Sequence, residues 1–252
     1  MRPRSFLPAS PAAPGPAPLP AEALTLSIII PTYNEAATIA SLLAYLRQPT
    51  AGELAAEIIV ADGGSTDATQ QLARQAGATV LHCPRRGRAA QMNHGAQHAQ
   101  GTLLYFLHAD SIPPAGFRYD LQQAVAQGYG SGCFRLTFDS AHWLLRFSAW
   151  CTRLPFTAVR FGDQSLFVRR ELFERIGGFR EELLVMEDQE IIRRLQAQAP
   201  FCVVPRAVLT SARKYQTNGV IRLQGIFTSI ALLYWLGVPQ RYLVRIYQRF
   251  IR

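Results

Sequence analysis

The alternation of short apolar runs with helical patterns in the first half of the chain is the feature that most constrains the fold. The runs are rich in isoleucine, valine, leucine and aromatic residues, a composition typical of strands buried on both faces of a parallel sheet. Four segments carry them: Leu24–Ile30, Glu57–Ala61, Thr79–His82 and Leu103–Leu107. Because helical patterns separate these runs, the sequence predicts a doubly wound, mostly parallel α/β sheet with right-handed crossovers.

The connections between the predicted strands carry helix signals. In Ala36–Arg47 the apolar residues recur at i, i+3, i+4 and i+7, the spacing of a helix that buries one face. The second connection opens at Asp62 with two glycines that allow a sharp turn, and the polar residues after them can cap a helix through Ala73. The third follows the basic loop 85–88 and is predicted to continue as a helix to about Ala99.

Polar residues follow three of the predicted strands directly. Thr32 and Glu35 come after the first strand, Asp62 after the second, and His108 and Asp110 after the fourth. Each also has a local interpretation, since carboxylates favour helix starts and aspartates shape turns. Their coincidence at the carboxyl edge of the sheet, where open α/β folds bind ligands, predicts a ligand site there.

His108 and Asp110 form the most specific pair in this set. If the strand continued through them, residues i and i+2 would project to the same side. An imidazole and a carboxylate placed together could hold a divalent cation such as Mn²⁺ or Mg²⁺. The alternative from the residues alone is a histidine that packs and an aspartate that starts a turn.

Composition and absent motifs exclude several classes of function. No G-x-x-x-x-G-K-[ST] run occurs, and no G-x-G-x-x-G follows the first strand, which argues against a P-loop or a dinucleotide site. The four cysteines are widely spaced, as expected for free thiols. The net charge is +9, and no acidic residue follows Glu190. This asymmetry indicates an anionic partner, either substrate phosphates or an acidic membrane surface, or else a solvated basic face. No nucleic-acid recognition module is present in the sequence.

Five short motifs resemble those of family-2 glycosyltransferases, an inverting group with the GT-A fold, and together they span about Leu24 to Arg213. They are I-I-I-P-T-Y-N-E at Ile28–Glu35, V-A-D-G-G-S-T-D at Val60–Asp67, G-R-A-A-Q-M-N-H-G-A at Gly87–Ala96, F-L-H-A-D at Phe106–Asp110, and G-G-F-R-E-E-L-L-V-M-E-D at Gly177–Asp188. The fold that this resemblance implies has a Rossmann-like nucleotide half and an acceptor half. The H-A-D form of the fourth motif is similar to a bacterial subgroup with mostly undefined acceptors.

The resemblance implies a role for each matched residue on the donor side. The nucleoside pocket would be lined by Pro31, Thr32, Glu35 and Asp62, with Asp62 facing the base. Arg88 would lie near the donor diphosphate, and Asp110 would be the metal ligand that closes the family's Asp-x-Asp motif. The first aspartate of that motif is His108 here, which leaves a metal ligand but removes one negative charge. The resemblance therefore implies Mn²⁺ or Mg²⁺ as cofactor, with the metal dependence open.

On the acceptor side, the resemblance implies that Gly162, Asp163 and Gln164 face the acceptor. It assigns the catalytic base to Asp188, preceded by Glu187. An inverting transfer requires one carboxylate to deprotonate the acceptor hydroxyl while a nucleoside diphosphate leaves. Without the other motifs, this carboxylate pair would be interpreted as an ordinary helix start. The basic and aromatic segment 213–215 could cover the pyrophosphate.

The two ends of the chain are predicted to differ from the glycosyltransferase domain at 24–215. Residues 1–23 are rich in proline and alanine and are predicted to be a disordered tail. Residues 216–252 are predicted to form an amphipathic helical segment. Its apolar run Gly225–Val238 has 14 residues, whereas a bilayer span needs about 20. Arginines then recur on one helix face from Arg241, so this segment either lies in an anionic membrane interface or packs on the domain.

The sequence thus predicts a glycosyltransferase, a member of the hexosyl- and glycosyltransferase class of enzymes (EC 2.4), with a nucleotide-sugar donor. We expect it in the cytoplasm, with peripheral attachment to the inner face of the cell membrane as one alternative. The acceptor hydroxyl is unknown, and a lipid-linked acceptor is one candidate. A nucleotidyltransferase is disfavoured because segment 31–35 lacks a Gly- and Lys-rich phosphate loop. A non-catalytic nucleotide-binding or membrane-scaffold protein on the same fold is the remaining rival.

Overall fold

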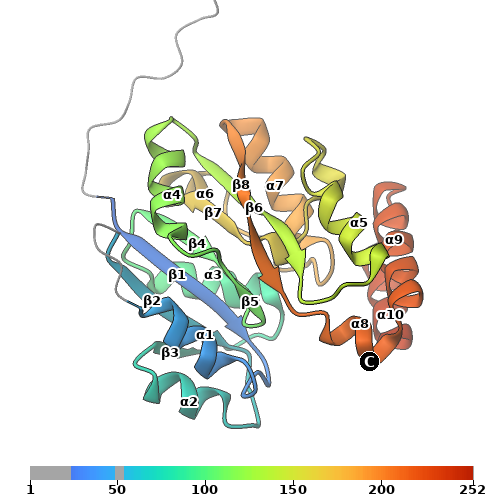
Figure 1. Ribbon diagram of the computed structural model, residues 1–252, viewed down its shortest axis with the longest axis horizontal. Coiled ribbons are helices and arrows are strands. Elements are labelled where there is room, and N and C mark those ends of the chain that lie inside the picture. The colour runs from blue at the N-terminus through green and yellow to red at the C-terminus, as the bar shows by residue number, and fades with distance from the viewer. Residues whose placement is uncertain (1–23, 49–53, 252) are drawn as a thin grey trace, which may run out of the picture.

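The computed structural model describes residues 24–48 and 54–251, so the predicted tail at 1–23 lies outside the described residues. The core is an eight-stranded sheet in the order β3-β2-β1-β4-β7-β6-β8-β5 (Figure 1). Its first four strands run parallel to one another. They are β1 (Leu26–Thr32), β2 (Ala56–Asp62), β3 (Thr79–His82) and β4 (Leu103–Phe106). These strands confirm the predicted parallel order of the first half of the sheet.

The second half of the sheet is mixed. Strand β7 (Leu166–Arg169) pairs antiparallel with both β4 and β6 (Ser131–Phe138). Strand β8 (Phe201–Thr210) returns parallel to β6. The two-residue strand β5 (Ser111–Ile112) closes the edge antiparallel to β8. The sheet is therefore mostly parallel, as predicted, with the antiparallel strand β7 joining its two halves.

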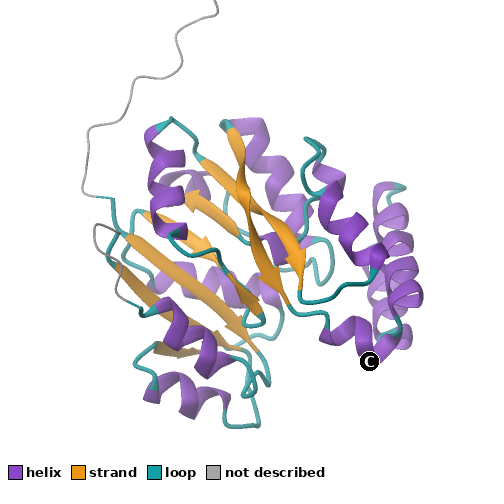
Figure 2. Cartoon of the chain, in the orientation of Figure 1, coloured by secondary structure: helices purple, strands orange, loops and turns teal. Residues whose placement is uncertain are grey.

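Helices cover both faces of the sheet because side chains alternate along each strand (Figure 2). Ile28 and Ile30 of β1 belong to the core under one set of helices, whereas Ile29 belongs to the core on the other face. The first set is α1 (Ile39–Leu46), α2 (Thr69–Gln75) and α4 (Phe117–Ala126). The second set is α3 (Arg88–His98), α6 (Arg170–Arg175) and α7 (Glu187–Gln198).

The end of β4 differs from the prediction. The strand stops at Phe106, and Leu107 makes one more backbone bond, to Ile29 O at 3.0 Å. The chain then turns, with Ser111 N donating to His108 O at 3.1 Å. His108 and Asp110 therefore lie in a turn beyond the strand, and the i, i+2 argument for their shared direction was wrong.

The remaining helices gather beside β6 and β8, at the end of the molecule away from β3 (Figure 1). They are α5 (Trp143–Cys151), α8 (Arg213–Asn218), α9 (Val220–Trp235) and α10 (Gln240–Phe250). Helix α9 packs against α5, α8 and α10. The short helices η1 (Thr157–Val159) and η2 (Gly162–Gln164) connect α5 to β7. Across the described residues, none of the helices combines the length and the hydrophobicity that crossing a bilayer requires.

Candidate active site

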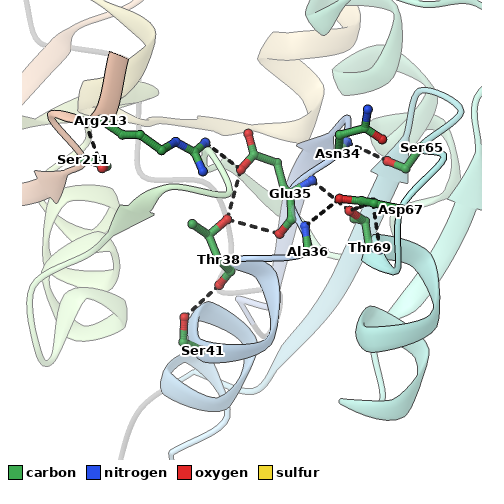
Figure 3. Close-up of polar contacts among 10 residues, drawn as sticks. All are labelled: Asn34, Glu35, Ala36, Thr38, Ser41, Ser65, Asp67, Thr69, Ser211 and Arg213. Carbon is green, nitrogen blue, oxygen red and sulfur yellow. Dashed lines mark hydrogen bonds and ion pairs between the residues drawn. The ribbon is translucent and has the colours of Figure 1, made fainter. Parts of the chain in front are cut away.

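The loops that follow β1 and β2 are joined to each other by hydrogen bonds (Figure 3). Asn34 N donates to Ser65 Oγ at 2.8 Å, and Glu35 N donates to Thr69 Oγ1 at 2.8 Å. Ala36 N donates to a carboxylate oxygen of Asp67 at 3.1 Å. These bonds pair three consecutive backbone N–H groups of one loop with side chains of the other, so the two motifs form one rigid unit.

Asp62, at the end of β2, organises this unit from within. Its carboxylate is fully buried and accepts hydrogen bonds from the backbone N–H groups of Gly64 and Ser65 at 3.0 and 2.8 Å. The hydroxyls of Thr32 and Ser65 and the amide of Gln70 also donate to it. Burial alone would raise the pKa of Asp62, but these hydrogen bonds outweigh burial and lower it. Asp62 is thus an ionised anchor of the loop.

A cavity of about 310 Å³ opens next to this unit, between the carboxyl ends of the strands and helices α9 and α10. Nine of the sequence-predicted site residues line it, and they come from both halves of the sheet. They are Pro31, Glu35, Arg88, His108, Asp110, Gly162, Asp163, Glu187 and Asp188. A cavity of this size is sufficient for part of a small ligand.

Asp188 and His108 meet across Gly162. A Cβ atom placed on Gly162 would lie 2.2 Å from Asp188 Oδ2 and 2.8 Å from His108 Cε1, so only glycine fits between them. Burial raises the pKa of Asp188, while the positive charges of His108 and Arg88 act in the opposite direction. A carboxylate whose pKa is raised by burial in a cavity is suited to accept a proton from a bound hydroxyl.

His108 is held by Asp163. Its Nδ1 lies 3.0 Å from Asp163 Oδ1, and the imidazole is buried. Burial alone would lower the pKa of His108, but the hydrogen bond to Asp163 and the negative charges of Asp163 and Asp188 together outweigh it and raise the pKa. For Asp163, burial acts to raise the pKa, and the bond from His108 with nearby positive charges lowers it to about 2. The pair therefore fixes the orientation of the imidazole, and Nε2 has no hydrogen bond within residues 24–48 and 54–251.

Glu187 occupies the first position of α7, beside Asp188. It is only 5% exposed, and Arg88 Nη1 lies 3.7 Å from its Oε1. Burial and the adjacent Asp188 raise the pKa of Glu187 to about 7, and Arg88 opposes this rise. Two carboxylates therefore share one buried helix start, and near neutral pH the first of them holds a proton for part of the time.

The residue before this pair has an unusual backbone conformation. Met186 has φ 68°, in the left-handed region that residues other than glycine seldom adopt. Asn34 and Ser165 also have positive φ, 56° and 57°, and they are the other such non-glycine residues in the described part of the chain. Met186 lines the cavity, Asn34 precedes the lining residue Glu35, and Ser165 follows η2, which contributes Gly162 and Asp163 to the lining. Strain of about 1–3 kcal/mol per residue is typically kept only where it positions functional groups.

The sequence profile of glycosyl transferase family 2 matches residues 27–180, more than half of the chain. The chain belongs to glycosyl transferase family 2. The matched range includes the paired loops, Arg88, His108 and Asp110, and it ends before Asp188.

Named relatives agree with this family. Glycosyltransferase AglJ of Haloferax volcanii is 34% identical over 103 residues, which are 40% of this chain and 33% of that protein. This family-2 chain therefore aligns with about a third of the length of AglJ. A PGL/p-HBAD biosynthesis glycosyltransferase of Mycobacterium bovis is 31% identical over 175 residues, 64% of this chain and 66% of that protein.

Solved structures confirm the GT-A fold of this family-2 chain. A mannosyltransferase from Pyrobaculum calidifontis, solved with GDP-Man and Mn²⁺, has a TM-score of 0.69 at 19% identity and covers 88% of this chain and 67% of that one. Glucosyl-3-phosphoglycerate synthase from Mycobacterium tuberculosis, solved with Mn²⁺, UDP and glucosyl-3-phosphoglycerate, has a TM-score of 0.59 at 21% identity. It covers 87% of this chain and 82% of that one.

Three of the residues proposed from the family motifs lie outside the cavity lining. Thr32 and Asp62 are buried and bonded to each other, so a contact between Asp62 and a base would have to replace one of its present bonds. Gln164 is buried as well, and its amide nitrogen donates to Phe134 O at 2.9 Å. In the present structure these three side chains are bonded within the protein and stabilise the segments that line the cavity.

Sequence reasoning missed much of the cavity wall that lies opposite the paired loops of β1 and β2. Its side chains come from β6, from the segment after η1, from α7 and from the C-terminal helices. The additional lining residues include Leu136, Phe138, Arg160, Phe161, Gln189, Phe227, Ile230, Ala231 and Tyr247. The only signal for them was the apolar face of the amphipathic C-terminal segment, which does not distinguish a cavity wall from a membrane contact.

Proposed function

We propose that the chain is an inverting glycosyltransferase that moves a sugar from a nucleoside diphosphate donor to an acceptor hydroxyl, with Asp188 as the base. The observation that carries this proposal is the position of Asp188 in the cavity wall, against Gly162 and beside His108 and the cationic Arg88. One carboxylate able to accept a proton thus lies next to groups suited to a leaving diphosphate. That combination is what an inverting transfer requires.

In the proposed step the acceptor oxygen attacks the anomeric carbon of the donor sugar. Its proton passes to the Asp188 carboxylate as the new carbon–oxygen bond forms. The bond from the anomeric carbon to the diphosphate breaks, and the nucleoside diphosphate leaves with the electron pair. Arg88, whose side chain is 42% exposed, would stabilise the negative charge that develops on the diphosphate.

His108 and Asp110 would hold a divalent metal, Mn²⁺ or Mg²⁺, together with the donor. The donor set fits such an ion: Asp163 engages His108 Nδ1 and leaves Nε2 free, the usual arrangement of a metal-binding histidine. Asp110 lines the cavity, and its carboxylate has no hydrogen bond or ion pair within the described part of the chain. When bound, the cation would neutralise charge on the leaving diphosphate.

Such a metal would need further ligands from the donor. Among residues 24–48 and 54–251, no group of three or more histidine, cysteine or carboxylate side chains is arranged to hold a metal ion. Diphosphate oxygens and water would complete the coordination of an ion at His108 and Asp110. This dependence makes metal binding and nucleotide binding mutually reinforcing.

The test is a calorimetric donor screen. UDP, GDP and TDP are titrated into the wild type and into Asp110→Ala, each with and without Mn²⁺. We expect one nucleotide to bind in a metal-dependent manner and Asp110→Ala to lose that dependence. Failure of all three nucleotides to bind would contradict the proposed function, and metal-independent binding would remove the metal from it.

We also propose that helices α5, α9 and α10 attach the protein to an anionic membrane surface. The chain has three tryptophans, and all are exposed on two contacting helices: Trp143 at 67% and Trp150 at 51% on α5, and Trp235 at 44% on α9. No acidic residue occurs in 140–162 or after Glu190. Exposed tryptophans on a surface rich in arginine are suited to the headgroup region of an anionic bilayer.

Vesicle flotation tests this attachment without deleting α9 or α10, which both line the cavity. We expect vesicles containing phosphatidylglycerol to retain the wild type, and Trp143→Ser with Trp150→Ser to release it. Tyr119→Ser on α4, where the side chain is 56% exposed, is the matched control and should float like the wild type. Equal recovery of the wild type and the double variant would contradict the attachment.

A further inference from the structure

The wall of the cavity opposite the paired loops is apolar. Strand β6 contributes Leu136 and Phe138, and one side of α9 contributes Phe227, Ile230 and Ala231. Leu136 and Ile230 are only 5% and 3% exposed, so they are packed as firmly as core residues. The charged residues Arg88, Glu187 and Asp188 line the same cavity.

Two polar side chains on this wall, Gln224 and Arg160, are bonded within the protein, whereas the buried Oε1 of Gln189 has no hydrogen-bond partner among the described residues. Gln224 of α9 accepts a hydrogen bond from Tyr215 at 3.2 Å. The Arg160 guanidinium is fully buried, donates to Thr152 O at 2.6 Å and also bonds Leu154 O, the carbonyls that follow α5. Arg160 therefore holds the end of α5 against the cavity.

A sugar acceptor would be poorly matched to such a wall. Each hydroxyl buried without a partner costs about 1–3 kcal/mol, and a sugar presents several of them. A hydrocarbon body instead gains roughly 0.8 kcal/mol for each methylene that it buries. The chemistry of the wall therefore favours a ligand that brings one hydroxyl to Asp188 and places carbon against α9.

We infer that this wall is the acceptor subsite and that it takes an amphiphilic alcohol, a hydroxyl carried on a hydrocarbon body. The inference rests on the proposed function, because it uses Asp188 as the base that the hydroxyl must reach. Its own support is the apolar lining and its continuity with the outer surface. Ser148 of α5 lines the cavity, while Phe147 and Trp150 of the same helix are 57% and 51% exposed. An acceptor dissolved in a bilayer could thus reach the wall past α5 and α9.

A pair of probes with the same headgroup separates hydrocarbon binding from sugar binding. Calorimetry compares n-octyl β-D-glucoside, below its micellar concentration, with methyl β-D-glucoside. We expect the octyl compound to bind the wild type at least about tenfold more tightly than the methyl compound, since most of its chain would be buried.

Variants on α9 then locate the binding. Ala231→Phe and the smaller Ala231→Leu would fill the wall, and both should abolish the preference for the octyl chain. Ser229→Phe, on the exposed side of the same helix, is the matched control and should retain the preference. UDP and GDP binding and the melting temperature are measured on every variant to show that the donor site and the fold persist.

The outcomes distinguish the two proposals. Equal binding of both glucosides by a protein that binds nucleotide would overturn the acceptor inference and leave the proposed function standing. Loss of octyl preference in Ser229→Phe as well as in Ala231→Leu would place the binding on the outer surface and also overturn the inference. Octyl preference without any nucleotide binding would support an apolar subsite and contradict the proposed glycosyl transfer.

Discussion

The two walls of the cavity are held in place by different forces. The wall at the ends of β1 and β2 is fixed by hydrogen bonds between side chains and neighbouring backbone, as around Asp62. The opposite wall is fixed mainly by apolar packing of β6, α5 and α9, and few polar contacts cross it. One of these is the bond from Gln240 Nε2 to Val185 O at 3.0 Å, which ties α10 to the loop before α7.

This difference suits two kinds of ligand. Directional hydrogen bonds fix a loop to within a narrow range of geometries, as is needed to bind a diphosphate and a nucleoside. Apolar packing is less directional, and it tolerates ligands that vary in length and shape as long as they bury carbon. We therefore expect donor selectivity to be strict and acceptor selectivity to be broad, and the following predictions test that expectation from the largest effect to the smallest.

The largest effect is expected at the point where the two walls meet. Asp188→Asn should lower the rate of sugar transfer or of donor hydrolysis by roughly 10²–10⁴-fold, the usual contribution of a general base. Nucleotide affinity should change little, because the substituted carboxylate lies on the acceptor side. Chromatographic assay of nucleoside diphosphate release, combined with calorimetry, measures both. Glu182→Gln, on an exposed residue near α7, is the control and should keep full activity.

The next effect concerns only the wall at the ends of β1 and β2, which we call the polar wall. Asp62→Ala removes the acceptor for the half-buried N–H groups of Gly64 and Ser65 and for three side-chain donors, which should lower the free energy of unfolding by about 2–4 kcal/mol. Asp62→Asn should recover part of this loss, because the hydroxyls of Thr32 and Ser65 can turn to accept from the new amide. Urea denaturation measures both variants. Equal losses in the two variants would show that the charge, and not the hydrogen-bond pattern, holds the loop.

Much of the polar wall could be predicted from the sequence because its contacts join residues that are close along the chain or lie at paired strand ends. The register Thr32 with Asp62 follows directly from the parallel pairing of β1 and β2. The chemistry of individual motif residues was harder to predict. Gln91 is buried and donates to Thr32 O at 2.7 Å and Ala61 O at 2.8 Å, so it fastens α3 to the sheet.

The apolar wall could not be predicted in the same way. Leu136, Ile230 and Tyr247 meet only because β6, α9 and α10 pack together, and an apolar residue on an amphipathic helix does not reveal whether it faces a core, a cavity or a membrane. The C-terminal segment, for which the sequence left open packing on the domain or contact with a membrane, illustrates this. Helix α10 packs on the domain through Leu243 and Tyr247. Its arginines remain exposed, so this packing leaves a basic face for the membrane contact proposed above.

A pH-dependent effect is expected at Glu187. Its pKa is raised to about 7 from the ordinary 4.5, so the folded state binds more protons than the unfolded state between these values, and stability falls as the pH rises through this window. Glu187→Gln removes the titration. Relative to the wild type it should gain about 2–3 kcal/mol of stability between pH 5 and pH 8. Asp188, Arg88 and His108 are the charged neighbours that remain.

Thermal unfolding in buffers across this range measures the difference between Glu187→Gln and the wild type. Glu182→Gln, whose side chain is exposed, should show a constant difference and serves as the control. A constant difference for Glu187→Gln as well would mean that Glu187 is ionised throughout, held by Arg88. Both carboxylates of the pair would then be charged, like the Asp62 carboxylate of the polar wall.

The smallest effect is expected at the ion pair that bridges the two walls. Arg213 of α8 reaches Glu35 of the β1 loop, with Nη2 3.1 Å from Oε2 (Figure 3). The two side chains are 47% and 21% exposed, and exposed pairs are worth about 0.2–1 kcal/mol. A double-mutant cycle of Glu35→Gln and Arg213→Gln should therefore give a coupling in that range, smaller at high salt.

The pair between Arg206 and Asp120, at 2.9 Å and with similar exposure, is the matched control, because it lies away from the cavity lining. If Arg213 covers the donor pyrophosphate, added nucleotide and Mn²⁺ should abolish the coupling with Glu35 and leave the control pair unchanged. A coupling that persists with bound nucleotide would keep Arg213 on the protein. A fixed contact would then join the two walls. The wall that includes α8 would be held by a polar contact as well as by apolar packing, and we would expect it to adapt less to different acceptors.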